Sequence, residues 1–309
     1  MKSSQVASSL VERVGDVLQG KEEVVRLVVV ALLARGHVLV EDVPGVGKTT
    51  LARALAASLG LSFRRLQFTS DLMPADVLGG NVFDRETGAF RFRKGPVFTQ
   101  VLLADEINRT TPKTQSALLE AMDEKQVSID GETHALDEPF FVLATQNPQD
   151  FYGTFPLPES QLDRFLVRLR IGYPPPEIER RVLETRRAAD PVAELEPVVT
   201  AEALREAQAA VDGVKVDGAV LDYLHGIVLA TREHALVEVG ASTRAALAFA
   251  RAVRAHALVD GRDYVLPDDV KALVLPVLSH RIRTRGGDGA RADAEAVLRE
   301  IREQAAVPV

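Results

Sequence analysis

The stretch EDVPGVGKTT, residues 41–50, constrains the fold of this chain more than any other part of the sequence. The apolar run HVLV (37–40) precedes it, and the helical pattern TLARALAASL (50–59) follows it. A glycine-rich turn between a strand and a helix is the context in which a loop encloses a nucleotide phosphate. We therefore predict an α/β fold with a largely parallel sheet, covered by helices on both faces.

The residues of this loop have separate expected tasks. Gly45 and Gly47 let backbone N–H groups turn inward around phosphate oxygens, and the following helix adds the positive end of its dipole. Lys48 supplies a charge for the β- and γ-phosphates, and Thr49 offers a hydroxyl to Mg²⁺. A chance Lys-Thr after a glycine turn is the alternative, which the surrounding strand and helix disfavour. Further nucleotide contacts of the loop are expected from Pro44, Val46 and Thr50.

Asp42 stands where the usual pattern G-x-x-x-x-G-K-[ST] has its first Gly. This position lies at the strand exit, before the part of the loop that encloses the phosphates. Asp tolerates turn conformations, but a carboxylate that faced the phosphates would oppose their binding. We therefore expect the Asp42 side chain to point away from the nucleotide.

Two further apolar strands end in polar residues, in VLLADEINR (101–109) and ATQNP (144–148). In open α/β sheets ligands bind at the carboxyl ends of the strands. Asp105 is expected to hold Mg²⁺, directly or through water, and Glu106 to orient or deprotonate an attacking water. Asn147 is a candidate partner of the γ-phosphate or the water. The alternatives are an exposed acidic turn for the pair and an ordinary Asn-Pro turn for Asn147.

Two arginines complete the set of candidate residues. Arg244 opens the helical stretch STRAALAFARAV, where the helix dipole disfavours a cation, so an anionic partner such as a phosphate is expected. A solvated Arg at small cost is the alternative. Arg164, in LPESQLDRF, either reaches a phosphate or pairs with Asp163.

The stiff stretch YPPPE (173–177) divides the chain. Before it, helical patterns separate five apolar runs, at 37–40, 63–68, 101–104, 140–145 and 165–171. The apolar stretch 24–34 is predicted to be a helix, because Glu22 and Glu23 lead it and Gly36 ends it. After the division only helical patterns remain. The predicted units are an α/β core (1–172), a hinge (173–177), an α-helical lid (174–283) and a flexible link with a terminal helix (284–309).

Two hairpins are predicted within the core, over 79–95 and 126–136. The second contains Asp130-Gly131, a strong two-residue turn signal. In the first, Phe90 and Phe92 alternate with Arg91 and Arg93, and Lys94 follows. This alternation is compatible with a nucleic-acid surface, but it is more typical of a hairpin with one packed and one solvated face.

Composition restricts the class of protein. The 309 residues carry a net charge of −7, which argues against a general nucleic-acid coat, and they include no Cys for disulfides or thiolate metal sites. The N-terminus shows no apolar signal region, and the most apolar run is too short to span a bilayer. We therefore expect a cytoplasmic protein without membrane insertion.

Several motifs together resemble the MoxR family of AAA+ ATPases, over residues 8 to 283. They are EDVPGVGKTTLARALA, QFTSDLMPADVLGG, LLADEINRTTPKTQSALLEAM, ATQNPQDFYGTFPLPESQLDRF and GASTRAALAFARA. The phosphate loop alone is not specific, whereas the linked set is. The resemblance implies a five-stranded P-loop core followed by a helical lid, assembled into a ring, usually a hexamer, with ATP between subunits.

The resemblance also implies roles for individual residues. Lys48 and Thr49 match the Walker A motif, and Asp105 and Glu106 match Walker B. Asn147 matches sensor 1, Arg164 the arginine finger that reaches the neighbour's γ-phosphate, and Arg244 sensor 2. The hairpin 79–95 is similar to the helix-2 insert of this clade, and both hairpins would touch clients. The segment 17–25, with Val17 and Gly20, resembles the part of the fold that contacts adenine.

Three functional hypotheses follow. The first is a Mg²⁺-dependent ATPase that remodels or matures protein partners. Members of the family that this chain resembles often work with proteins that carry a von Willebrand factor A domain. The second is a DNA-associated AAA+ motor, which the acidic balance disfavours. The third is a nucleotide-gated binding protein with little turnover, which would need neither Glu106 nor Arg164.

Overall fold

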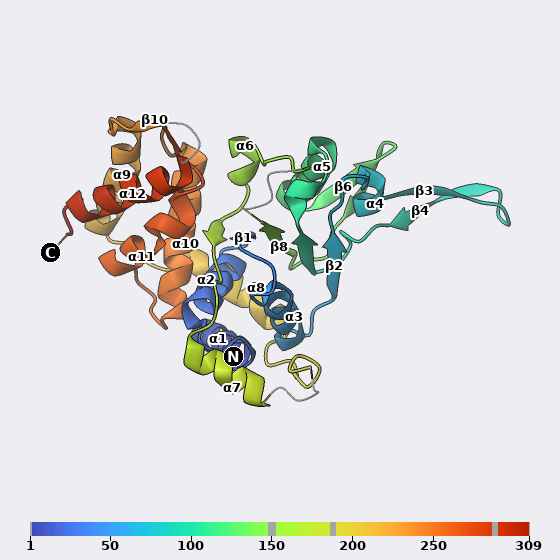
Figure 1. Ribbon diagram of the computed structural model, residues 1–309, viewed down its shortest axis with the longest axis horizontal. Coiled ribbons are helices and arrows are strands. Elements are labelled where there is room, and N and C mark those ends of the chain that lie inside the picture. The colour runs from blue at the N-terminus through green and yellow to red at the C-terminus, as the bar shows by residue number, and fades with distance from the viewer. Residues whose placement is uncertain (1, 148–152, 186–189, 286–289, 309) are drawn as a thin grey trace.

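The core of the protein is a five-stranded parallel sheet. The computed structural model describes residues 2–147, 153–185, 190–285 and 290–308 (Figure 1). The strands lie in the order β2, β5, β8, β1, β9, and every pairing between them is parallel. Their bounds are β1 Val38–Glu41, β2 Phe63–Gln67, β5 Val101–Asp105, β8 Phe141–Gln146 and β9 Val167–Leu169. The predicted fold class and the five apolar strands are confirmed.

The central strands are buried on both faces, which explains their continuous apolar sequence. Successive residues of a strand point to opposite faces of the sheet. Val101 and Leu103 of β5 accordingly pack with α1 (Ser3–Val17), α2 (Glu22–Leu33) and α3 (Lys48–Ser58). Leu102 and Ala104 pack with α5 (Pro112–Glu124) in a second apolar cluster. The predicted helix over 24–34 is confirmed as α2.

The chain after 173–177 is largely helical, as predicted. Its helices are α7 Pro176–Thr185, α8 Ala201–Ala210, α9 Gly218–Glu233, α10 Thr243–Val259, α11 Pro267–Leu278 and α12 Ala290–Gln304. A short antiparallel pair, β10 (Val237–Val239) with β11 (Arg283–Thr284), is a β element that the sequence patterns did not predict. The predicted flexible link therefore begins with a paired strand, and its residues 286–289 lie outside the described part of the chain.

The lid and the core share buried surface. Helix α8 packs on α1 and α10 packs on α2, so lid side chains such as Phe249 belong to the same apolar cluster as the core helices. The terminal helix α12 packs on α9 and α11, which makes it part of the lid. A hinge at 173–177 stays a prediction, and lid motion about it would have to rearrange the α1–α8 and α2–α10 contacts.

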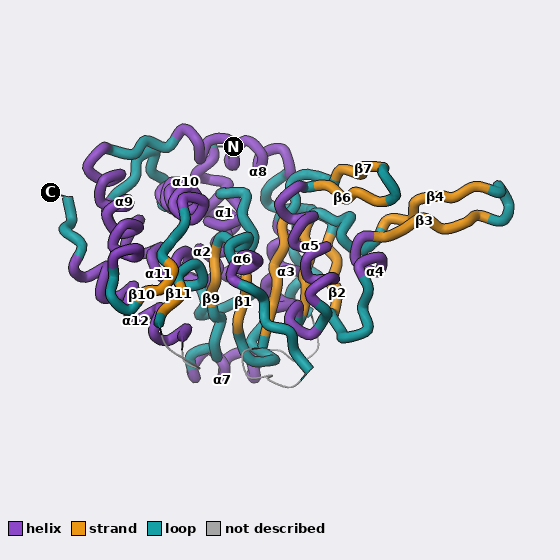
Figure 2. The backbone as a smooth tube through the Cα atoms, turned by 90° about the horizontal axis from the view of Figure 1, so that it is seen from above, coloured by secondary structure: helices purple, strands orange, loops and turns teal. Residues whose placement is uncertain are grey.

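Two hairpins project from one side of the core (Figure 2). They are β3 (Gly79–Asp84) with β4 (Ala89–Lys94), and β6 (Gln126–Ile129) with β7 (Glu132–Ala135). The remaining short elements are the helices α4 Pro74–Leu78 and α6 Glu159–Leu162 and the 3₁₀ turns η1 Ile107–Arg109 and η2 Val211–Gly213. The two predicted hairpins are thus confirmed.

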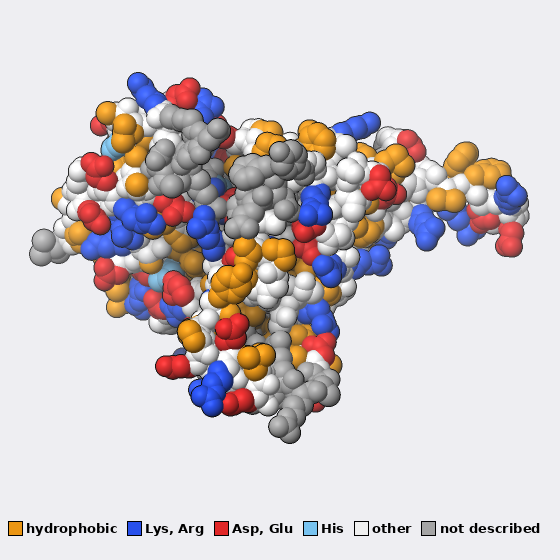
Figure 3. All heavy atoms as spheres, in the orientation of Figure 1, with side chains coloured by type: hydrophobic (Ala, Val, Ile, Leu, Met, Phe, Trp, Pro, Cys, Tyr) orange, Lys and Arg blue, Asp and Glu red, His pale blue; other side chains and the backbone are white. Residues whose placement is uncertain are grey.

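The longer hairpin separates its aromatic and basic residues. Cross-strand partners share a face, so the pairs Phe83–Phe90 and Asn81–Phe92 point one way and Arg91 and Arg93 point the other. Phe92 stacks on His134 of the second hairpin with ring centroids 3.9 Å apart. In Figure 3 hydrophobic side chains gather along one edge of this projection and charged ones along the other. Arg91 and Arg93 therefore lie on the face opposite to Phe90 and Phe92, whereas Lys94 shares the aromatic face and places its Nζ 5.1 Å from the centre of the Phe98 ring.

Candidate active site

The carboxyl ends of β1, β5 and β8 surround a polar cavity of about 340 Å³. Most of the site residues predicted from the sequence line it, which places the glycine-rich loop, the acidic pair and Asn147 around one space. Its lining comprises Pro44, Gly45, Gly47, Lys48, Thr49, Thr50, Arg65, Gln67, Asp105, Glu106 and Asn147.

The loop has the backbone that phosphate binding requires. Gly45 and Gly47 have φ angles of 87° and 98°, in the left-handed region that favours glycine. Helix α3 begins at Lys48, so its free N–H groups point into the cavity. The Lys48 Nζ donates to the Asp42 carbonyl oxygen at 2.5 Å, and burial lowers the pKa of this amine. A phosphate would give this desolvated cation a charged partner.

Asp42 turns its carboxylate away from the cavity, as the sequence predicts. Oδ2 accepts hydrogen bonds from the backbone N–H groups of Ile171 and Gly172 at 2.7 and 2.6 Å, and Oδ1 accepts from Val43 N at 2.8 Å. Asp42 is buried. The residue that departs from the usual motif therefore ties the phosphate loop to the chain that leaves β9 towards the lid.

Replacing Asp42 with Ala or Gly is expected to lower the free energy of unfolding by roughly 3 kcal/mol, because buried N–H groups lose a charged acceptor. Gly is the usual residue here, yet we expect Asp42→Gly to destabilise this chain as much as Asp42→Ala, since neither supplies an acceptor. Urea unfolding of the three proteins measures the difference. A stable Asp42→Gly variant would show that the carboxylate contributes nothing.

Thr145 of β8 orders the Asp105 carboxylate and the backbone of Glu106. Its hydroxyl donates to Asp105 Oδ1 at 2.6 Å and accepts from the Glu106 N–H at 2.9 Å. Asp105 Oδ2 accepts from the Arg65 guanidinium at 2.6 and 3.1 Å. The Arg65 side chain is half exposed, so its departure would open this oxygen to a cation. One fixed and one releasable oxygen suit Asp105 to hold Mg²⁺ together with Thr49.

Glu106 is held from two sides. It has φ 59°, an uncommon value for a residue other than glycine, at the turn between β5 and η1. Its Oε2 accepts from Gln67 Nε2 at 2.5 Å and lies 3.2 Å from Arg109 Nε. Arg65 and Gln67 were missed from the sequence. Because successive residues of a strand point to opposite faces, residues 65 and 67 of β2 share one face. This spacing was the sequence signal that could have identified them.

A second cavity, of about 370 Å³, adjoins the first and shares Pro44, Gly45, Gly47 and Thr50 with it. Val17 lines it, as predicted, and Gly20 lies beside it with a φ of 72°, close to Pro175. The sequence did not predict that α7 closes this cavity. Further lining residues include Leu18, Lys21, Tyr173, Ile178, Val182 and Leu183. An apolar cavity joined to a polar one across a phosphate loop fits the base and phosphates of ATP.

Arg164 and Arg244 line neither cavity. Both contact Asp123 at the end of α5, at 2.6 Å for Arg164 NH1 and 2.9 Å for Arg244 NH2. Of the two alternatives for Arg164, the structure does not show the pairing with Asp163: Arg164 contacts Asp123, and the Asp163 carboxylate contacts Arg281 at 2.6 Å. The anion that offsets the helix dipole at Arg244 is thus Asp123, within the same chain. The two arginines lie together, outside the polar cavity of the same chain.

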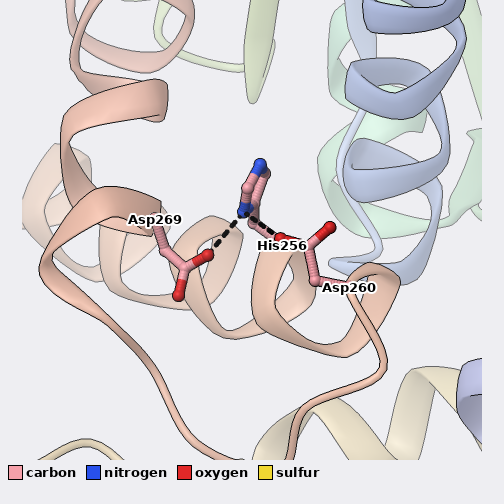
Figure 4. A group of neighbouring side chains, drawn as sticks. All are labelled: His256, Asp260 and Asp269. Carbon is pink, nitrogen blue, oxygen red and sulfur yellow. Dashed lines mark hydrogen bonds and ion pairs between the residues drawn. The ribbon is translucent and has the colours of Figure 1, made fainter.

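His256, Asp260 and Asp269 form a cluster with the spacing of a metal site (Figure 4). Their oxygens are already used, because Arg262 donates to both Asp260 and Asp269, at 2.9 and 2.6 Å, and Arg26 of α2 also bonds Asp260. Two guanidinium groups replace the charge that a cation would bring. The cluster is therefore an ion-pair network that ties the lid to the core helix α2.

Comparison with known proteins agrees with this geometry. Residues 37–167 match the ATPase family associated with various cellular activities (AAA), and residues 229–301 match the AAA lid domain. The lid match extends past the predicted boundary at 283 and includes most of α12. Among the described residues, no helix is long and apolar enough to cross a membrane.

Similar proteins cover nearly the whole chain. YeaC of Bacillus subtilis is 48% identical, over 97% of this chain and 94% of its own length. The chaperone MoxR1 of Mycobacterium tuberculosis is 40% identical, over 94% of this chain and 80% of its own. The crystal structure of a proposed ATPase from Cytophaga hutchinsonii superposes with a TM-score of 0.86 at 36% identity, covering 96% of each chain. This chain belongs to the MoxR family of AAA+ ATPases.

Proposed function

We propose that this protein hydrolyses ATP in a Mg²⁺-dependent reaction at sites shared between the subunits of a ring, and that it uses the energy of hydrolysis to remodel protein partners. The observation that carries the proposal is the position of Arg164 and Arg244. They lie side by side on Asp123 and outside the phosphate cavity, so a second subunit is needed to bring a phosphate to them. A hexamer is the assembly that the family resemblance favours.

Within one site the residues divide the work. Lys48 and the N–H groups of the phosphate loop neutralise the β- and γ-phosphates, and Asn147 contacts the γ-phosphate or the water. Glu106, oriented by Gln67, aligns and deprotonates the attacking water. Thr49 and Asp105 would hold Mg²⁺, which would supply Lewis-acid stabilisation of the phosphate charge.

Arg164 and Arg244 are proposed to complete the site of the neighbouring subunit. An arginine finger supplied in trans stabilises the charge of the transition state. In the structure both guanidinium groups share one carboxylate, and the Arg244 side chain is more than half exposed. If the two guanidinium groups left Asp123 and bound the phosphate of a nucleotide in the neighbouring subunit, they would therefore replace one anionic partner with another.

The proposed partners are proteins. The relative MoxR1 is named a chaperone, and a partner with a von Willebrand factor A domain is proposed from the family resemblance. The projecting hairpins are the proposed client contacts, since Phe83 and Phe90 are exposed at the end of the longer one. The DNA-motor alternative loses support because Arg91 and Arg93 of this hairpin face away from Phe90 and Phe92. The binding-protein alternative leaves the ordered Glu106 without a task.

The rate of ATP hydrolysis per subunit is expected to rise with protein concentration as the ring forms. The mass of the assembly, measured with and without ATP over the same range, identifies the step at which activity appears. A monomeric particle whose specific activity is constant would overturn the shared-site proposal. Stimulation of hydrolysis by DNA that falls steeply with salt would instead favour the motor.

A further inference from the structure

The segment that carries Arg164 has little regular structure of its own. It follows the single turn of α6 and ends where β9 begins at Val167. Carbonyl groups in such a connection have no partners in a helix or a sheet and need donors from elsewhere. The lid supplies those donors.

Arg281 is the principal donor. It follows α11 in the lid and lies 118 positions after Asp163. Its Nε donates to Asp163 Oδ1 at 2.6 Å, and its terminal nitrogens donate to the carbonyl oxygens of Asp163, Phe165 and Leu166 at 3.1, 2.9 and 3.1 Å. The side chain is only 3% exposed. A fork of donors therefore fixes the backbone on both sides of Arg164.

The neighbouring His280 strengthens this grip. Its Nε2 lies 2.8 Å from the Phe165 carbonyl oxygen, inside the core. Burial holds the pKa of His280 well below its usual range, so the ring is neutral and Nε2 carries the proton that it donates. Two consecutive lid residues thus bond the same short segment.

A ladder of alternating charge continues from Arg281 to Arg164. Asp163 lies between Arg281 and Arg244, at 2.6 and 4.0 Å. Asp123 then lies between Arg244 and Arg164. Each carboxylate contacts two guanidinium groups, so displacing one member changes the electrostatic energy of the next.

We propose that Arg281 is a positioning residue that holds residues 163–166 so that Arg164 points to the neighbouring subunit. This inference rests on the proposed shared site. Arg281 is too buried to touch a nucleotide, and it acts through the segment that it bonds. Since Arg281 belongs to the lid and Arg164 to the core, the position of the lid in one subunit sets the rate of hydrolysis in the next.

Mixed assemblies test this inference. Arg281→Lys keeps the charge but not the planar fork, and its own phosphate cavity is untouched. Alone, it is expected to lose about 10²-fold in ATPase rate, the effect of misplacing a catalytic group by about 1 Å. Glu106→Gln subunits lack hydrolysis but retain Arg164. Mixing the two variants is expected to restore activity, whereas mixing Arg281→Lys with Arg164→Ala is not.

Controls separate this inference from the proposed function. Arg164→Ala mixed with Glu106→Gln must regain activity if sites are shared, and its failure would overturn the proposed function itself. If that pair regains activity and Arg281→Lys with Glu106→Gln does not, the positioning role is overturned. Full activity of Arg281→Lys alone overturns it too. Arg299→Lys, an exposed arginine on α12, is the matched control and should behave as the unmodified protein.

A second variant keeps the test valid if Arg281→Lys does not fold, as checked by its thermal unfolding. Asp163→Asn removes the carboxylate that the Arg281 Nε contacts and leaves the buried guanidinium in place. It is expected to show the same pattern of rescue: activity with Glu106→Gln and none with Arg164→Ala. The opposite pattern, rescue by Arg164→Ala alone, would place the defect in the variant's own phosphate site and overturn the inference.

Discussion

Replacing Glu106 with Gln is expected to slow ATP hydrolysis by about 10²–10⁴-fold, because the amide cannot accept a proton from the attacking water. ATP binding should persist, since the phosphate contacts come from Lys48 and the glycine loop. The Gln67 contact tests the orientation of the group: Gln67→Ala removes the 2.5 Å hydrogen bond to Glu106 and should slow the reaction less than Glu106→Gln.

Single-turnover hydrolysis and the binding of a fluorescent ATP analogue measure these two quantities separately. Glu120→Gln is the matched control, because Glu120 is exposed on α5 and has no expected task. Retained turnover in Glu106→Gln would remove this residue from the mechanism. Loss of binding as well as turnover would assign Glu106 to the nucleotide pocket instead.

Replacing Arg164 with Ala is expected to lower the rate by about 10³–10⁵-fold, the range found when an arginine finger is absent. In the proposed ring the finger contributes to a site in another subunit, so the variant should still bind ATP in its own cavity. It should also assemble as the unmodified protein does, because the residue stabilises a charge that develops only in the transition state.

Mass measurement with ATP and steady-state hydrolysis, made on the same sample, test this expectation. Arg299→Ala provides the matched removal of an exposed arginine. A variant that assembles and hydrolyses ATP normally would exclude Arg164 as the finger. Loss of assembly would make Arg164 an interface residue, and the Arg244→Ala variant would then decide whether the neighbouring arginine is the catalytic one.

Local sequence signals were sufficient to predict the strands of the core and most residues of the candidate site. The apolar runs predicted the five strands because strands buried on both faces need continuous apolar residues. Glycines with positive φ marked the phosphate loop, and polar residues at the ends of β5 and β8 marked the edge where it opens. Even the direction of the Asp42 carboxylate followed, because an anion is excluded from a phosphate site.

Contacts between segments that are distant in the sequence could not be predicted from those local signals. Nothing local to Asp123 shows that it binds Arg164 and Arg244. The local alternative for Arg164, a pairing with its neighbour Asp163, is not the one that the structure shows. Helix α7 closes the apolar cavity although its sequence shows only an ordinary helical pattern. A charged residue can pair with a neighbour in the sequence, but folding also brings it close to charged residues from distant segments.

The sequence by itself determined the P-loop core, the helical lid and most of the residues that line the polar cavity, because periodicity and turn chemistry act over a few residues. The tertiary structure decided which charges meet. It brought Arg281 of the lid onto the carbonyl groups around Arg164, and it placed Arg164 and Arg244 on Asp123, outside the phosphate cavity. Such pairings depend on how the sheet order and the packing of the lid fold the chain back on itself, and residue spacing does not encode them locally.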